Sequence, residues 1–92
     1  KYPPIGRRSV VGGYTIFDYR TLPVSEVVPA LQENTLVACM IETPAGVANI
    51  EAIAAVEGID VIHIGINDLL TAMGKPGQFG DAEAAAAINK VI

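Results

Sequence analysis

Two acidic residues stand at the ends of apolar stretches in the second half of the sequence. Glu42 ends the stretch LVACMIE, and Asp68 comes three positions after the stretch IDVIHIG. Two carboxylates that lie close together repel each other unless a proton, a base or a cation lies between them. Neither motif contains Lys or Arg, whereas Mg²⁺ and Mn²⁺ are commonly held by one or two carboxylates with water and substrate oxygens. The pair therefore predicts a site for a hard divalent cation.

The proximity of these carboxylates depends on the two apolar stretches, residues 36–42 and 59–65. Both are continuous rather than alternating, which is typical of strands buried on both faces of a parallel sheet. In parallel folds built from strand–helix units, active sites lie at the carboxyl ends of the strands. If the strands are neighbours, Glu42 and Asp68 share that edge of the sheet.

A helix is predicted between the two strands. Thr43 can cap it, with Pro44 at the first helical position, where a missing N–H costs nothing. Apolar residues at spacings of three and four predict its buried stripe, and Gly58 is expected to end it. The stripe consists of Val47, Ile50, Ile53, Ala54 and Val56.

The remaining segments are predicted as loops and two further helices. Residues 1–24 lack any lasting period and predict a long loop. A helix from a Ser25 cap to about Asn34 follows, with Pro29 near its first turn. A second long loop holds one helical turn at 69–73, and Asp81 caps a final Ala-rich helix. The buried side of the Ser25 helix is predicted to be Val27, Val28 and Leu31.

This order of elements predicts an α/β fold with a parallel sheet and helices outside it. The chain has 92 residues, and a (β/α)₈ barrel needs about 250, so these residues match about a third of one. Neither end carries a start or stop signal. We therefore expect residues 1–92 to be a fragment of a single barrel domain.

Composition excludes several classes of function. The net charge of −4 and the presence of only six basic residues argue against nucleic-acid binding. No apolar run approaches the roughly 20 residues of a membrane helix, and no signal peptide is recognisable. Cys39 is the only cysteine, so no internal disulfide is possible, and we interpret it as a small buried apolar residue. A cytoplasmic protein is expected.

Each carboxylate also has an ordinary structural explanation. Glu42 would cap the helix that follows it, and Asp68 would close a turn. For either residue alone this explanation is favoured, but the matching places at two strand ends favour metal binding for the pair. His63 has the pKa range of a general base, yet its mid-strand place favours a core or interstrand histidine.

Three segments of the sequence resemble one known family. The segments KYPPIGRRSVVGG, MIETPAGVANIEAIAAVEGID and HIGINDLLTAMGKPGQFGD are similar in order and spacing to the HpcH/HpaI aldolase family. These are class II metal-dependent pyruvate aldolases, including 4-hydroxy-2-oxoheptanedioate and 2-keto-3-deoxy-rhamnonate aldolases. The resemblance implies a (β/α)₈ TIM barrel, represented here from about the fourth-strand loop through the sixth helix.

The resemblance also implies a reaction and a site. The family's enzymes are carbon–carbon lyases that reversibly cleave a 4-hydroxy-2-oxo acid to pyruvate and an aldehyde, and they often form hexamers. By resemblance, Glu42 and Asp68 are the ligands of a catalytic Mg²⁺, Mn²⁺ or Co²⁺. The backbone N–H groups of Asn67 and Asp68 would hold the pyruvate carboxylate. Arg8, in the YPPxGxR loop, would order that loop or contact an acidic substrate, with a surface ion pair or backbone contact as the plain alternative.

The sequence departs from the common family pattern at two positions. Met40 stands where many members have Gln, and Ile66 where many have Pro, so substrate preference is expected to differ. The family's substrate-carboxylate Arg and catalytic His are expected upstream of Lys1, and no catalytic residue is assigned within these 92.

Two alternatives stay open at this point. One is a lyase similar to the citrate lyase β-subunit and malyl-CoA lyase, which shares the acidic pair but handles CoA thioesters. The YPPxGxR and MGKPGQFGD motifs favour the aldolase over it. The other is a non-catalytic, metal-binding barrel fragment, if the 92 residues are the whole molecule.

Overall fold

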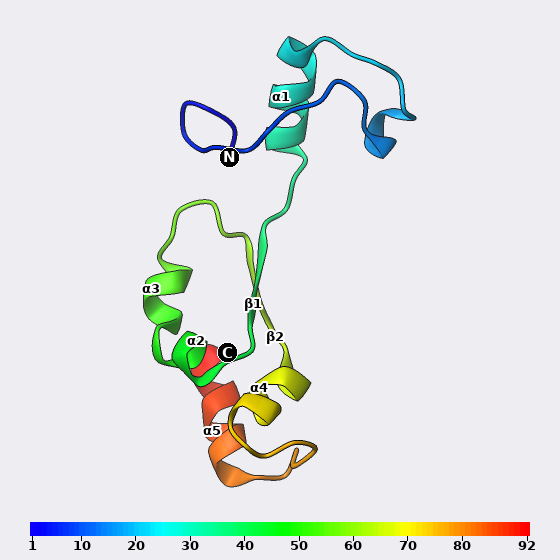
Figure 1. Cartoon of the computed structure of the whole chain (residues 1–92). Helices are drawn as coiled ribbons and strands as arrows, with labels where there is room; N and C mark the ends of the chain where they lie inside the picture. The colour runs from blue at the N-terminus through cyan, green and yellow to red at the C-terminus, as the bar shows by residue number, and fades with distance from the viewer. The chain divides into compact units, whose positions relative to one another are not determined.

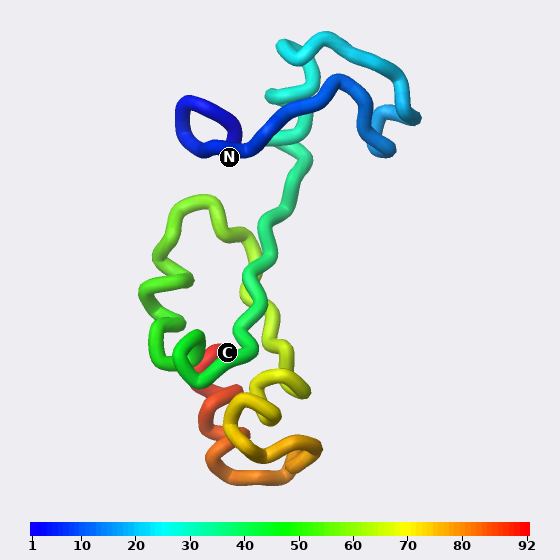
Figure 2. The backbone as a smooth tube through the Cα atoms, viewed as in Figure 1, coloured from blue at the N-terminus to red at the C-terminus, as the bar shows by residue number.

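The computed structural model describes residues 1–92, which divide into two compact units (Figure 1). The first is Lys1–Thr35 and the second is Leu36–Ile92. Figure 2 traces the backbone through both, from blue at the N-terminus to red at the C-terminus. The elements in chain order are η1 (Thr15–Phe17), α1 (Val24–Glu33), β1 (Ala38–Ile41), α2 (Pro44–Ala48), α3 (Ile50–Ala54), β2 (Val61–Ile64), α4 (Ile66–Ala72) and α5 (Ala82–Val91).

In the first unit, a long loop packs against α1. The predicted loop is confirmed, except for the short 3₁₀ helix η1. Tyr2 is buried against two side chains of α1, Val27 and Leu31, which are also buried. Tyr14 and Phe17 pack on this cluster, with their rings edge to face. Three aromatic residues of the loop and two apolar residues of α1 thus form the core of the first unit.

The start of α1 differs from the prediction. Pro23, not Ser25, occupies the N-cap position, and Pro29 lies inside the helix rather than in its first turn. Pro29 has no N–H to donate to the Ser25 carbonyl. Both residues are exposed, so water can reach that carbonyl and the helix tolerates the missing bond. The predicted buried side is confirmed at Val27 and Leu31.

The second unit contains a two-stranded parallel sheet of β1 and β2, as predicted. The register pairs Met40 with His63 and Ile41 with Ile64. At the start of the sheet, the Val37 N–H donates to Asp60 Oδ2 at 2.8 Å, and the Val37 carbonyl accepts the N–H of Asp60 at 2.9 Å. Side-chain and backbone hydrogen bonds therefore fix this register where the strands begin.

The two faces of the sheet have different surroundings. Ile41 is buried in a cluster with Val47, Ile50 and Leu69, to which α2, α3 and α4 contribute; α5 packs against the same cluster. The opposite face is exposed; we call it the open face, and it consists of Ala38, Met40, Val61 and His63. The prediction of strands buried on both faces is therefore wrong for this chain, because its helices cover one face only.

The same arrangement corrects the interpretation of two single residues. His63 is exposed on the open face beside Met40 rather than buried in a core. Cys39 lies on the helix-covered face and is half-buried rather than buried. The error at His63 arises because an apolar strand sequence does not tell which face the neighbouring helices cover.

The segment between the strands forms two short helices instead of one. Thr43 caps α2 as predicted, accepting the Gly46 N–H at 3.1 Å, and Pro44 is the first helical residue. The break comes at Asn49, whose side-chain amide donates to the Ala45 carbonyl at 2.8 Å. Gly58 lies after the end of α3, in a turn with φ of 92°. Of the predicted stripe, Val47 and Ile50 are buried, Ile53 is half-buried, and Ala54 and Val56 are exposed.

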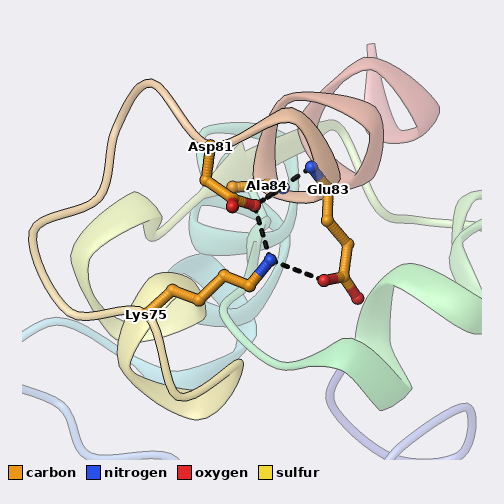
Figure 3. Close-up of polar contacts among 4 residues, drawn as sticks. All are labelled: Lys75, Asp81, Glu83 and Ala84. Carbon is orange, nitrogen blue, oxygen red and sulfur yellow. Dashed lines mark hydrogen bonds and ion pairs between the residues drawn. The ribbon is translucent and has the colours of Figure 1, made fainter.

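The loop before α5 is held by one lysine (Figure 3). Lys75 Nζ donates to Asp81 Oδ1 at 2.7 Å and to Glu83 Oε2 at 2.6 Å. Asp81 Oδ1 also accepts the N–H groups of Glu83 and Ala84 at 3.0 Å, which confirms the predicted cap. Phe79 is 62% exposed, so the polar contacts of Lys75, not the aromatic ring, hold this loop.

These contacts link stability to pH. The hydrogen bond from Lys75 holds the pKa of Asp81 below its ordinary value of 3.8, and the bond to Asp81 raises the pKa of Lys75 above 10.5. The contribution of Asp81 is complete above pH 3.8 and is lost as the pH falls through its lowered pKa; that of Lys75 is lost as the pH rises through its raised pKa.

We therefore expect Lys75→Met to lower the unfolding free energy of the intact protein at pH 7. The difference from the wild type should shrink as the pH falls below 3.8. Urea unfolding at several pH values measures this difference. Lys90→Met is the matched control, because Lys90 contacts only a backbone carbonyl, at 3.5 Å. A difference for Lys75→Met that is the same at every pH would contradict the ion-pair explanation.

Candidate metal site at the carboxyl ends of the strands

Glu42 follows directly after β1, at the carboxyl end of the strand. It is exposed, and the alternation of a strand places it on the same side as Met40 of the open face. A Cβ atom built on Gly65 would lie 3.1 Å from Glu42 Cβ and 3.1 Å from Met40 Sδ. The Glu42 side chain therefore begins beside the end of β2.

Asp68 lies in the first turn of α4, the helix that follows β2. Gly65 links the two elements, because its N–H donates to the Ile41 carbonyl at 3.0 Å and its carbonyl accepts the Leu69 N–H at 2.8 Å. The sequence predicted a helical turn only from residue 69, but α4 begins at Ile66 and includes Asp68. Both carboxylates thus follow the carboxyl ends of two paired parallel strands.

The ordinary structural explanation does not account for Glu42. Thr43, not Glu42, supplies the capping oxygen of α2. Asp68 lies within a helical turn whose cap position is Gly65, and no side chain caps that helix. The ion pairs of the chain are those of Lys75, so both carboxylates lie exposed without a basic partner.

The donor set fits a hard divalent cation. No group of three or more His, Cys, Asp or Glu side chains comes close enough to hold a metal ion by itself. A closed structural zinc site needs four protein ligands. Mg²⁺ and Mn²⁺ instead accept one or two carboxylates and keep positions for water and substrate oxygens. Two carboxylates at one sheet edge match this second kind of site.

The predicted substrate-binding residues lie in different parts of the chain. Asn67 is exposed in the first turn of α4. Because Leu69 makes the first backbone bond of that helix, the N–H groups of Asn67 and Asp68 precede its hydrogen-bonded ladder. They are therefore free to donate hydrogen bonds to a carboxylate oxygen, and this role stays a prediction.

Arg8 belongs to the first unit and packs on an aromatic ring. Its guanidinium carbon lies 4.8 Å from the centre of the Tyr2 ring, and the backbone N–H of Arg8 donates to the Lys1 carbonyl at 3.2 Å. These contacts join Arg8 to Tyr2 and Lys1 at the start of the same loop. Tyr14 is hydrogen-bonded to Tyr2 at 3.5 Å; this bond raises the pKa of Tyr2 and lowers that of Tyr14. Contact between Arg8 and a substrate stays a prediction.

Met40 and His63 lie on one face of the sheet beside the acidic pair, and of the two only Met40 was connected with the site by the resemblance. Both point to the open face, which continues to Glu42 on one strand and to Gly65 on the other. Counting back by two from Glu42 and Gly65, the period of a strand, identifies both residues. That signal was present in the sequence.

A profile of the HpcH/HpaI aldolase/citrate lyase family matches residues 1–92. The chain belongs to this family. Among curated relatives, a 4-hydroxy-4-methyl-2-oxoglutarate aldolase of Chaetomium globosum is 40% identical over 92 residues, 99% of this chain and 34% of that protein. A hydroxypyruvate/pyruvate aldolase of Delftia acidovorans is 39% identical and aligns with 100% of this chain and 34% of its own length.

Solved structures of similar fold agree with this membership. The citrate synthase SbnG matches with a TM-score of 0.76 and 31% identity, over 99% of this chain and 33% of that one. An HpcH/HpaI aldolase from Desulfitobacterium hafniense matches with a TM-score of 0.75 and 32% identity, over 99% and 35%. The chain spans about a third of the length of the curated relatives it matches. None of its helices has the length and apolar character needed to cross a lipid bilayer.

The helix that carries Asp68 is anchored by the next residue, Leu69, which is 1% exposed. We expect Leu69→Ala to lower the unfolding free energy of the intact protein by about 2–5 kcal/mol, because it leaves a cavity in the cluster of Ile41, Val47 and Ile50. Gln78→Ala, in an exposed loop, should change it by about 0.5 kcal/mol or less. Chemical denaturation of both variants measures this; equal effects would contradict the assignment of Leu69 to the core.

Proposed function

We propose that the intact protein is a metal-dependent aldolase that reversibly cleaves a 4-hydroxy-2-oxo acid to pyruvate and an aldehyde. The observation that carries this proposal is the pair Glu42 and Asp68 at the carboxyl ends of two paired parallel strands. The relative from Chaetomium globosum supports the substrate class, because its name contains a 4-hydroxy-2-oxo acid. The name of the Delftia acidovorans relative supports pyruvate.

The open face supports a larger barrel around this site. Parallel sheets are normally covered on both faces, whereas β1 and β2 are covered on one. We propose that the chain contributes two strands to a (β/α)₈ barrel, with Met40 and His63 facing its interior. Glu42 and Asp68 would then lie at the mouth of the barrel, where such enzymes have their active sites.

The reaction assigns a task to each residue. Cleavage breaks the bond between C3 and C4, the C4 hydroxyl proton goes to a base, and the electron pair moves toward the 2-oxo oxygen. Protonation of C3 then yields pyruvate, and C4 leaves as the aldehyde. Glu42 and Asp68 would hold Mg²⁺, Mn²⁺ or Co²⁺, while the N–H groups of Asn67 and Asp68 would orient the substrate carboxylate. The cation would supply Lewis-acid stabilisation of the negative charge that develops on the 2-oxo oxygen.

The resemblance implies a catalytic His as the base and an Arg that binds the substrate carboxylate, both outside these 92 residues. Arg8 would order its loop and contact an acidic substrate. The resemblance further implies a cytoplasmic homo-oligomer, a hexamer in the family, and both remain predictions.

One rival activity is favoured by a specific observation. The family profile includes citrate lyases, and one similar solved structure is named a citrate synthase. A lyase similar to citrate lyase β or malyl-CoA lyase would need acetyl-CoA with glyoxylate rather than pyruvate with an aldehyde. Parallel assays of the intact protein with both substrate pairs separate the two. Cation binding without turnover of either pair would identify the non-catalytic alternative.

Removal of the cation or of either carboxylate tests the mechanism. We expect EDTA to abolish pyruvate-dependent aldol activity, and Glu42→Gln or Asp68→Asn to lower kcat/KM about 10²- to 10³-fold. Loss of several kcal/mol of transition-state stabilisation corresponds to this range. Both substitutions should also weaken Mn²⁺ binding, measured by calorimetry.

Glu57→Gln is the matched control, because Glu57 is an exposed acid that precedes the start of β2, whereas Asp68 follows the other end of this strand. It should retain wild-type kinetics and Mn²⁺ affinity. Activity that survives both chelation and the two substitutions would exclude the proposed mechanism.

A further inference from the structure

We propose that Gly65 is a positioning residue for Glu42: the absence of a side chain at the end of β2 sets the place of the Glu42 carboxylate and hence the affinity for the cation. This inference rests on the proposed function, because it takes Glu42 as a metal ligand. It concerns a residue that contacts neither the cation nor the substrate through a side chain. Its action would pass through the packing of the two strand ends.

The contact is closer than an ordinary one. A Cβ on Gly65 would lie 3.1 Å from Glu42 Cβ and 3.1 Å from Met40 Sδ, whereas ordinary van der Waals contacts of a Cβ lie at 3.4–4 Å. A methyl group at Gly65 would therefore require one or both neighbours to move by a few tenths of an ångström. Which neighbour can move decides the consequence.

Met40 can move without consequence for the sheet. The atoms near a Cβ on Gly65 are Sδ at 3.1 Å and Cγ at 3.3 Å, and both belong to a flexible, unbranched side chain. Rotation about its side-chain bonds takes Sδ away from Gly65. The contact with Met40 is therefore not the one that resists an added methyl group.

Glu42 Cβ cannot move in this way, because a Cβ atom follows its own backbone. The backbone before it is held by the Gly65 N–H, which donates to the Ile41 carbonyl at 3.0 Å. The backbone after it is held by Thr43, which caps α2 and accepts the Val47 N–H at 3.0 Å. A methyl group on Gly65 would therefore push the Glu42 backbone away from the strand end that leads to Asp68.

The requirement for glycine at this position is spatial, not torsional. Gly65 has φ of −82° and ψ of 78°, so its φ is negative and open to alanine. Gly74 and Gly77 differ, because their φ of 73° favours glycine for its backbone. Alanine at position 65 is thus compatible with the local chain path, and its main effect would be on the separation of the two strand ends. Mg²⁺ demands near-ideal geometry, so such a shift weakens its binding.

The test compares Mn²⁺ affinity among glycine and methionine variants of the intact protein. Gly65→Ala should lower the Mn²⁺ association constant about tenfold, while the thermal unfolding midpoint shows that the protein stays folded. Gly80→Ala is the matched control, because a Cβ there meets no atom within 4 Å and the φ is not positive. It should bind Mn²⁺ like the wild type.

A double variant separates the two contacts. In the Met40→Ala background, Gly65→Ala should still lower the Mn²⁺ association constant about tenfold, because the clash with Glu42 Cβ remains. If Gly65→Ala retains wild-type affinity while Glu42→Gln loses it, the inference is wrong and the proposed function stands. If Met40→Ala restores the affinity of Gly65→Ala, crowding of Met40 is the cause and the inference is also wrong. If the wild type binds no Mn²⁺, the proposed function and this inference both fail.

Discussion

The parallel register of β1 and β2 is the constraint on which the candidate site depends. It is fixed at the start of the strands by Asp60 and Val37 and at their carboxyl ends by the bond from Gly65 to Ile41. Because side chains alternate along a strand, this register decides which residues share a face. A slip of one residue would turn a strand's helix-covered side chains to the open face. The close approach of Glu42 and Gly65 follows from the same register.

Local chemistry made part of the fold predictable. The helix caps are examples: Thr43 precedes Pro44, and Asp81 precedes an Ala-rich segment. Their side-chain oxygens accept N–H groups of the next turn, so these caps form without distant partners. The break at Asn49 was not predictable from the apolar stripe. Its side-chain amide donates to the carbonyl of Ala45 in α2, and such local competition with the helix is not visible in periodicity. Likewise, Pro29 is tolerated only because its surroundings are exposed.

The places of Glu42 and Asp68 after the two strands were predictable, but their surroundings were not. Glu42 and Asp68 were placed at one sheet edge by a general property of parallel folds, and the pairing of the strands agrees with that placement. The open face was not predicted. A continuously apolar strand sequence indicates burial on both faces, but it does not tell which elements cover each face. Here the helices cover the side of Ile41, and Met40 and His63 remain exposed. Resemblance to a family supplied the expected substrate, which neither spacing nor burial supplies.

The helix that carries Asp68 is held on the side away from the open face. Leu69 and Leu70 are buried, and the Leu70 carbonyl accepts the Lys75 N–H at 2.8 Å just past the end of α4. The side chain of the same lysine binds Asp81 and Glu83 at the start of α5. One residue therefore ends α4 with its backbone and joins the start of α5 with its side chain. Since α5 also packs against the cluster that contains Leu69, a movement of Asp68 would have to disturb both helices. The Asp68 carboxylate is thus exposed on a helix that is firmly packed. A metal ligand that is open to substrate requires both properties.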